Sequence, residues 1–447
     1  MLRRTVIAVA ASSLTLSGCG GGEASPTSTG VAVAPAPTPT PTPTPTPSPT
    51  PPPTQTQGAG AHQFASDFDD GTAYPAAATV DLASFDVPAG STQVHVPVTL
   101  NRPTANTIVS FIRVYNGDGG RAAPDTVKTL IFRSGDPLTK TVTFDVRNMS
   151  EGNTVKVTQA NVPDGGKRGV NSATITAKAG SSNAPVTGGR AALAFKPYGT
   201  EVYSETGATI AFDDQGGPQT FSTSLVHGRT QYYNSETGYY GPIDMGGFER
   251  NGGNVVLKTF RPAAPIRMGS PIVEYPFVAS VLSGHKTTAT HFKYGTVEWQ
   301  VRLPNRRGTW PAMWLLPTAG WPPEIDVYEG FGFNDGWKFD SDLSTNLHGG
   351  KNGGSRTFTR PALHMTTQDF GIAPTLDSEF HTFAVTVTPD WITIFLDGRE
   401  TMQYANPFAG QTWYPLTQLA TKAKIDDPYT EGKGTLELRS LRVWRAE

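Results

Sequence analysis

The chain has 447 residues, which is enough for two or three domains and at least one sizeable core. Its 36 basic and 38 acidic residues nearly balance, and only 17% of the residues are charged, which argues against nucleic acid or an anionic membrane surface as a partner. The single cysteine excludes an intramolecular disulfide and a thiolate metal cluster.

Residues 1–18 are predicted to be a lipoprotein signal peptide. Arg3 and Arg4 form a positive start, and the apolar stretch 5–16 is too short to span a bilayer. The tetrapeptide that follows resembles a bacterial lipobox, Leu16-Ser17-Gly18-Cys19. This resemblance implies that cleavage leaves Cys19 as the lipidated first residue of a protein anchored in the bacterial cell envelope, facing the periplasm or the exterior. An ordinary secretory peptide with an incidental cysteine is the alternative.

Residues 19–60 are predicted to be a Pro/Thr-rich linker. No charged residue occurs between positions 25 and 57, and positions 35–53 are almost entirely Pro and Thr. Such a sequence favours polyproline II, so twenty residues reach about 60 Å. We interpret the segment as a spacer in preference to a ligand for a proline-binding module.

Residues 76–180 are predicted to form a small immunoglobulin-like β-sandwich. Apolar residues alternate along several short runs, for example at Val94, Val96 and Val98, and turn-rich clusters separate the runs. The runs 132–135 and 140–144 resemble a Calx-beta type of module. Asn148 and Met149 stand where that module has an acidic pair, so no metal site is assigned. The region has no Trp, which favours a spacer over a sugar-stacking platform.

Residues 181–190 form a second predicted linker, and residues 191–447 a second folded region. All eight Trp residues lie in this region, and β-type runs recur without an amphipathic helical period longer than about three turns. One core of this size built from antiparallel strands predicts two large stacked sheets, a jelly roll. The whole protein is therefore predicted to be all-β.

The main candidate site is the acidic strand Glu324-Ile325-Asp326-Val327-Tyr328-Glu329. Alternate residues of a strand share a face, which places Glu324 beside Asp326. Glu329 has the opposite parity, so it can join them only if a β-bulge inserts one extra residue before it. The alternative is a solvated strand face.

A second run supplies aromatic side chains. Trp310, Ala312 and Trp314 share one face of a predicted strand, while Met313 and Leu315 share the other. Two indoles beside carboxylates make a groove that can stack sugar rings, although Trp pairs at strand spacing are more often core.

These motifs together resemble glycoside hydrolase family 16. The likeness covers residues 191–447 and rests on Tyr294-Gly295-Thr296-Val297-Glu298, Gly308-Thr309-Trp310-Pro311-Ala312-Met313-Trp314, Glu324-Ile325-Asp326-Val327-Tyr328-Glu329, Phe380-His381-Thr382-Phe383, Asp397-Gly398 and Leu441-Arg442-Val443-Trp444. The longer acidic motif, with its bulge, is similar to the laminarinase and agarase side of the family.

The resemblance assigns the catalytic roles. It implies that Glu324 is the nucleophile, Glu329 the general acid and base, and Asp326 the neighbour between them. Three acids so close cannot all ionise at neutral pH, so we expect Glu329 to have a raised pKa and Asp326 to share a proton with Glu324.

Other side chains are candidates for substrate binding or for the core. The sugar-contact candidates are Trp310, Trp314 and Trp321. His348 matches a family position near the cleavage site, although a solvated loop histidine is an equal alternative. Trp413 is a weaker candidate for the groove edge, and His381 matches a mostly structural family position.

The resemblance implies an endo-acting retaining β-glycosidase that hydrolyses a polysaccharide, a β-1,3-glucan or a related glucan, galactan or exopolysaccharide. We expect the protein to be a monomer. A carbohydrate-binding surface lipoprotein without catalysis is the alternative, and a structural adhesin is a third reading. No cofactor and no metal site are assigned. The family often carries a structural calcium, whose ligands the resemblance does not locate here. The expected membrane contact is the N-terminal lipid anchor alone.

Overall fold

The computed structural model describes residues 78–116, 127–160, 166–231, 234–350, 357–359, 365–423 and 432–446. The predicted signal peptide, Cys19 and the first linker lie outside these residues, and the predicted domain boundaries stay predictions. None of the helices in the described ranges is long and apolar enough to cross a membrane.

The N-terminal β domain consists of two sheets in the described residues. One sheet has the strand order β6 (Thr139–Met149), β3 (Ser91–Leu100), β1 (Thr79–Leu82), β8 (Lys167–Arg168). The other has the order β2 (Phe85–Val87), β9 (Ser172–Ala177), β7 (Thr154–Gln159), β4 (Ile108–Asn116), β5 (Val127–Phe132). The alternating residues of β3 that the sequence assigned to a core, Val94, Val96 and Val98, are buried.

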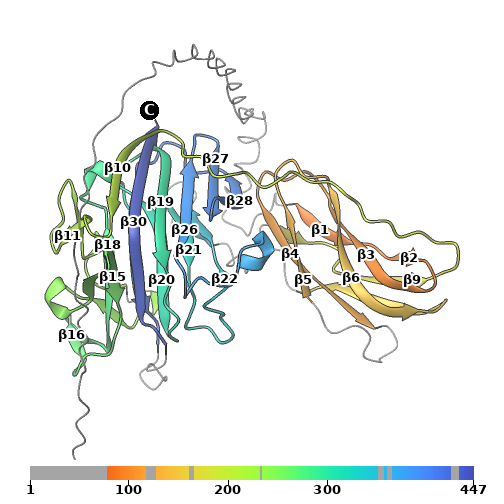
Figure 1. The fold of residues 1–447 in the computed structure, drawn as a ribbon, viewed down its shortest axis with the longest axis horizontal. Coiled ribbons are helices and arrows are strands. Elements are labelled where there is room, and N and C mark those ends of the chain that lie inside the picture. Colours follow the sequence, from red (N-terminus) through yellow and green to blue (C-terminus); the bar gives the residue numbers. More distant parts are fainter. Residues whose placement is uncertain are drawn as a thin grey trace, which may run out of the picture. The chain divides into compact units, whose positions relative to one another are not determined.

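The C-terminal part is a sandwich of two larger sheets (Figure 1). Its first sheet runs β14 (Phe248–Asn251), β15 (Asn254–Lys258), β30 (Thr435–Ala446), β19 (Tyr294–Arg302), β26 (His381–Val387), β27 (Trp391–Leu396), β28 (Arg399–Ala405), with β10 (Thr200–Thr206) also on β30. The pairs from β15 to β28 are antiparallel, as predicted for a jelly roll.

The second sheet carries the acidic strand. Its order is β11 (Ala211–Asp213), β12 (Thr220–Ser222), β18 (Phe277–Ser283), β29 (Trp413–Thr421), β20 (Thr309–Pro317), β21 (Glu324–Glu329), β23 (Asn346–Gly350), β24 (Thr357–Thr359), with β13 (Gly238–Tyr240) also on β18. Two small pairs complete the strands of the described residues, β16 (Ile266–Met268) with β17 (Val273–Tyr275) and β22 (Asp342–Leu343) with β25 (Met365–Thr366).

Helices in the described part of the sandwich are short 3-10 turns. They are η3 (Ile243–Met245), η4 (Thr288–Thr290) and η6 (Thr367–Phe370). The prediction that long amphipathic helices are lacking is confirmed for the described residues.

The two faces of the second sheet differ. Met313 and Leu315 of β20 pack into the main core between the sheets, whereas Ala312 and Trp314 belong to a separate apolar cluster on the outer face. The predicted division of this strand into two faces is confirmed. We call the face that carries Ala312 and Trp314 the outer face of the catalytic sheet, because the candidate acids lie on it.

Candidate active site

A β-bulge brings Glu329 to the outer face. Three consecutive residues of β20 pair in order with Glu329, Tyr328 and Asp326, which leaves Val327 without a partner on β20. Val327 and Tyr328 therefore both point into the main core. The change of parity places Glu329 on the same face as Asp326, and the bulge predicted from the sequence is confirmed.

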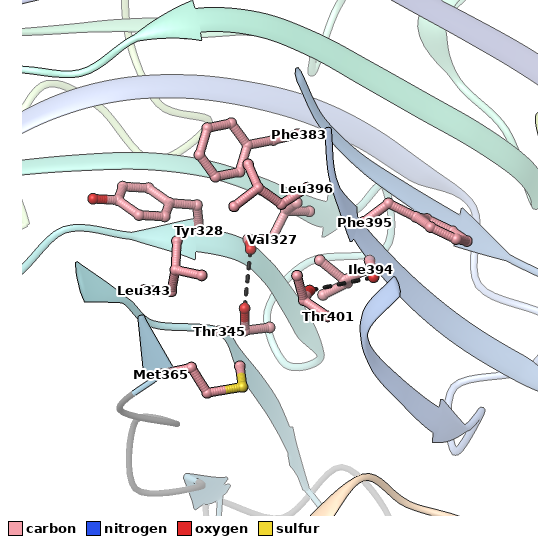
Figure 2. Close-up of a pocket in the computed structure, with 10 residues that line it drawn as sticks. All are labelled: Val327, Tyr328, Leu343, Thr345, Met365, Phe383, Ile394, Phe395, Leu396 and Thr401. Atoms are coloured by element: carbon pink, nitrogen blue, oxygen red, sulfur yellow. Dashed lines mark hydrogen bonds between the residues drawn. The ribbon is translucent and has the colours of Figure 1, made fainter. Parts of the chain in front are cut away.

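The segment 344–346 holds this bulge from the neighbouring side. Thr345 Oγ1 donates a hydrogen bond of 3.1 Å to the carbonyl oxygen of Val327, drawn in Figure 2. The backbone N–H of Glu329 donates to the Ser344 carbonyl at 3.0 Å, and Asn346 Nδ2 donates to the Glu329 carboxylate. Three consecutive residues thus bind the bulged residue, the backbone of Glu329 and its carboxyl group.

Glu329 is buried among hydrogen-bond donors. Its side chain is 8% exposed, and Trp310 Nε1 donates to its Oε1 at 3.0 Å. Burial raises the pKa of Glu329, while the charge of His348 and the hydrogen bonds from Asn346 and Trp310 act in the opposite direction. The net effect is a carboxyl group that holds its proton more strongly than a solvated Glu, as a general acid requires.

Glu324, Asp326 and His348 form a second cluster beside it. Glu324 pairs with His348 across β21 and β23, and His348 Nε2 lies 3.0 Å from Asp326 Oδ2 and 3.8 Å from Glu324 Oε1. Burial raises the pKa of Asp326 well above its usual range, and the charge of Glu329 adds to this. Burial and the charge of Asp326 likewise raise the pKa of Glu324 well above its usual range.

These shifts mean that the three carboxyl groups cannot all be ionised near neutral pH. Asp326, which is 2% exposed, is the most deeply buried of them and shares a hydrogen bond with Glu324. Their hydrogen bond raises the pKa of Glu324 and lowers that of Asp326, so the two carboxyl groups share one proton, which keeps two negative charges out of contact.

The same cluster has a spacing compatible with a metal ion, since the donor atoms of Glu324, Asp326 and His348 lie within 4.8 Å of one another. Asp326 Oδ2 already lies 3.0 Å from His348 Nε2, and the family resemblance leads us to expect Glu324 to be a nucleophile rather than a metal ligand. We therefore assign no metal to the cluster.

The three candidate tryptophans lie in different environments. The half-buried Trp310 ring makes T-shaped contacts with Phe331 and Phe333, and the Lys422 ammonium lies 5.3 Å from its centroid. Trp314 is 5% exposed and belongs to the apolar cluster of the outer face, whereas Trp321, in the loop before Glu324, is 56% exposed. Trp321 is thus the tryptophan of the three whose ring is most accessible to a sugar.

Two weaker candidates from the sequence have different outcomes. Trp413 is fully buried in the main core, so its prediction as a groove-edge residue is wrong. His381 is buried as well, and its Nδ1 lies 2.7 Å from Asp397 Oδ2, in keeping with a structural position.

Sequence reasoning missed two polar residues near the acids, Asn346 and Glu236. Asn346 lies two residues before His348 on the same strand, so alternation alone could have placed it on the same face. Glu236 had no such signal. It is 5% exposed and accepts a hydrogen bond of 2.7 Å from the Tyr240 hydroxyl. Burial raises the pKa of Glu236 to about 8, with a smaller contribution from the charge of Glu329.

Comparison with known proteins agrees with this geometry. Residues 258–427 match the model of glycosyl hydrolases family 16. The chain is 26% identical over 201 residues to a galactan endo-β-1,3-galactanase of Flammulina velutipes, covering 43% of this chain and 72% of that protein. It is 37% identical over 115 residues to a β-glucanase of Rhodothermus marinus, covering 23% and 35%.

Among solved structures, the laminarinase catalytic domain of Thermotoga maritima is similar at 18% identity and a TM-score of 0.42, covering 57% of this chain and 100% of that one. The sandwich, the acidic strand and the family match define a glycoside hydrolase of the endo-β-glycanase type. The C-terminal part of this chain belongs to glycosyl hydrolases family 16. The chain spans 72% of the first relative and about a third of the second.

Proposed function

We propose that the protein is an endo-acting retaining β-glycosidase that cleaves a β-1,3-linked glucan or galactan. The observation that carries the proposal is the bulge at Val327, which sets Glu324, Asp326 and Glu329 on one face of the catalytic sheet. The names of the relatives, a β-1,3-galactanase and a β-glucanase, support the substrate class.

The first step forms a covalent glycosyl-enzyme. Glu324, as carboxylate, attacks the anomeric carbon, while Glu329 gives its proton to the glycosidic oxygen and the leaving sugar departs. The donors Trp310 and Asn346, which hold the Glu329 carboxyl, stabilise the carboxylate that this proton transfer leaves behind. Asp326, which is hydrogen-bonded to Glu324, takes up the proton that the two share as Glu324 attacks in its carboxylate form.

The second step releases the product. Glu329, now ionised, removes a proton from a water molecule, whose oxygen attacks the anomeric carbon and breaks the ester bond to Glu324. The configuration at the anomeric carbon is retained because inversion occurs twice. Glu329 thus has to change between its protonated and ionised forms at one pH, and the opposing effects of burial, which raises its pKa, and of His348, Asn346 and Trp310, which lower it, suit this.

Substitution of either acid tests these roles. Glu324→Gln and Glu329→Gln should each abolish turnover of laminarin, mixed-linkage β-glucan, β-1,3-galactan and agarose, with unchanged thermal unfolding. Azide should restore product formation by Glu324→Ala as a glycosyl azide, because the anion fills the place of the missing carboxylate. An azide-insensitive Glu324→Ala would contradict the nucleophile assignment, and polysaccharide binding by the wild-type protein without product would favour a lectin.

We also propose that Cys19 anchors the protein in the bacterial envelope and that residues 19–60 act as a tether. The lipobox-like tetrapeptide and the uncharged Pro/Thr tract support this. Cys19→Ser should move the protein from the detergent phase to the aqueous phase on Triton X-114 partition, and an unchanged partition would contradict the anchor.

A further inference from the structure

Lys422 places a positive charge against the indole ring that holds Glu329. Lys422 directly follows β29, and its ammonium lies 5.3 Å from the ring centroid of Trp310 and 4.8 Å from that of Phe333. Both distances are in the range of cation–π attraction. The same indole donates its Nε1–H to Glu329 Oε1 at 3.0 Å. One ring therefore connects a cation to the carboxyl group that has to transfer a proton.

Strand pairing fixes the place of Lys422 beside this ring. Trp310 pairs with Ala420, and the N–H of Lys422 donates to the Gly308 carbonyl at 2.9 Å, which continues the pairing of β29 with β20. Residues two apart on a strand share a face, so the side chain of Lys422 lies on the same face as that of Ala420 and of its partner Trp310.

Three side chains hold the indole ring. Phe331 and Phe333 make T-shaped contacts with it at centroid distances of 5.9 and 5.1 Å, and the Lys422 ammonium is the third contact. These contacts limit rotation of the ring about its side-chain bonds. The Nε1–H lies at the rim of the ring, so a small rotation is enough to turn it away from the Glu329 carboxyl group.

We propose that Lys422 is a positioning residue for Glu329, because it holds the Trp310 ring in the orientation in which the indole N–H meets the carboxyl group. The effect is indirect, since Lys422 contacts the ring and the ring contacts Glu329. The inference rests on the proposed function, in which Glu329 is the general acid and base.

Other titratable groups interact with Glu329 and have to be separated from this effect. They are His348, Asp326, Glu324 and Glu236. Lys422 also acts on Glu236, since its charge lowers the pKa of that buried carboxyl group. The two segments are adjacent, because the N–H of Thr237 donates to the Thr421 carbonyl at 2.8 Å. Glu236→Gln removes this second titrating group and still accepts a hydrogen bond from Tyr240.

Lys422→Met tests the inference because it removes the charge and keeps an unbranched side chain. We expect kcat/KM on laminarin or β-1,3-galactan to fall about fivefold, and the alkaline limb of its pH profile to move up by about half a pH unit. The 2,4-dinitrophenyl β-glycosides of laminaribiose and β-1,3-galactobiose should react as before, because their leaving group departs without a proton. Lys422→Arg should keep most of the activity, since a guanidinium also stacks on an indole.

Two backgrounds test the route through Trp310. In Trp310→Phe the N–H is already absent, so Lys422→Met should move the pH profile little further. In Glu236→Gln the effect of Lys422→Met should persist. A loss of kcat/KM that is equal on polysaccharide and dinitrophenyl glycoside, or that is undiminished in Trp310→Phe, would overturn the positioning role.

Lys128 of the N-terminal β domain offers a matched control. It is half-buried like Lys422, and its ammonium lies 5.4 Å from the ring centroid of Phe144. Lys128→Met should lower stability without changing kcat/KM per folded molecule. If Lys422→Met does not fold, Lys422→Gln provides the same comparison.

Indole NMR separates this inference from the proposed function. In 15N-labelled protein the N–H resonance of Trp310 is the one that Trp310→Phe removes, and it should shift with pH as Glu329 titrates. Lys422→Met should reduce that shift. Wild-type turnover with unchanged kinetics and resonance in Lys422→Met overturns the positioning role and leaves the glycosidase intact. A reduced shift without wild-type turnover supports the positioning role and overturns the glycosidase, and an unchanged shift without turnover overturns both.

Discussion

The hydrogen bond from Thr345 to the bulged residue Val327 gives the sharpest test of how the fold positions Glu329, the proposed acid/base. Thr345 is 4% exposed, and Thr345→Val replaces its hydroxyl with a methyl group of similar size. The Val327 carbonyl oxygen, which accepts a hydrogen bond of 3.1 Å from Thr345 Oγ1, then loses this donor. Such a buried unpaired group costs about 1–3 kcal/mol.

The same free energy favours the bulged register over a regular one, which would turn Glu329 to the other face. A loss of about 1.4 kcal/mol corresponds to a tenfold change in that equilibrium, so kcat/KM should fall by up to about tenfold. Thermal unfolding should shift down by only a few degrees, since about 1 kcal/mol moves the Tm of a domain of this size by roughly 2–4 °C.

Thr401 provides the matched control. It lines the same small cavity behind the catalytic strand, is also 4% exposed, and its Oγ1 donates to the Ile394 carbonyl at 3.3 Å (Figure 2). It too lies at a bulge, because Phe395 and Ile394 pair with Glu400 and Met402 on either side of it. Thr401→Val should therefore lower Tm by a similar amount and leave kcat/KM unchanged. Equal activities of the two variants at equal folded concentration would refute the positioning role of Thr345.

Three further changes probe the acid/base, a structural histidine and the exposed tryptophan. Trp310→Phe removes an N–H that favours the ionised form of Glu329, so the pKa of Glu329 should rise further. The alkaline limb of the pH profile of kcat/KM should then move up by about one pH unit. An unmoved limb would show that this N–H does not act on Glu329. Burial lowers the pKa of His381, but the hydrogen bond and the charge of Asp397 outweigh burial and raise this pKa above its usual value. The stabilisation of the fold by protonated His381 is therefore complete below about pH 6.5 and is lost as the pH rises through the folded-state pKa. Asp397→Asn should therefore flatten the decline of the unfolding free energy above pH 6.5 in urea titrations, and a decline that persists would point to other groups. Trp321→Ala should raise KM roughly fivefold with unchanged kcat and Tm, because the ring is 56% exposed and contributes stacking area; an unchanged KM would exclude it as a sugar platform.

The fold and the central acids could be predicted from the sequence because both depend on the two-residue alternation of side chains along a strand. Two-residue alternation marked the two faces of β20 and put Glu324 and Asp326 together. The mismatch in the parity of Glu329 was itself informative, since only a bulge could reconcile it with a shared site, and the structure has that bulge at Val327. A local pattern thus predicted a deviation from regular pairing.

The residues that hold the bulge and the carboxyl groups in place have no such local pattern in the sequence. Thr345 reaches the carbonyl of Val327 from a segment 18 positions further along the chain. Trp310 reaches the carboxyl group of Glu329 across the pairing of β20 with β21, from 19 positions earlier. Nothing in the residues around Thr345 distinguishes it from any other buried polar side chain of the sheet. Its role comes from the strand register, which sets its hydroxyl group against the carbonyl of the bulged residue while the neighbouring Ser344 carbonyl accepts the N–H of Glu329.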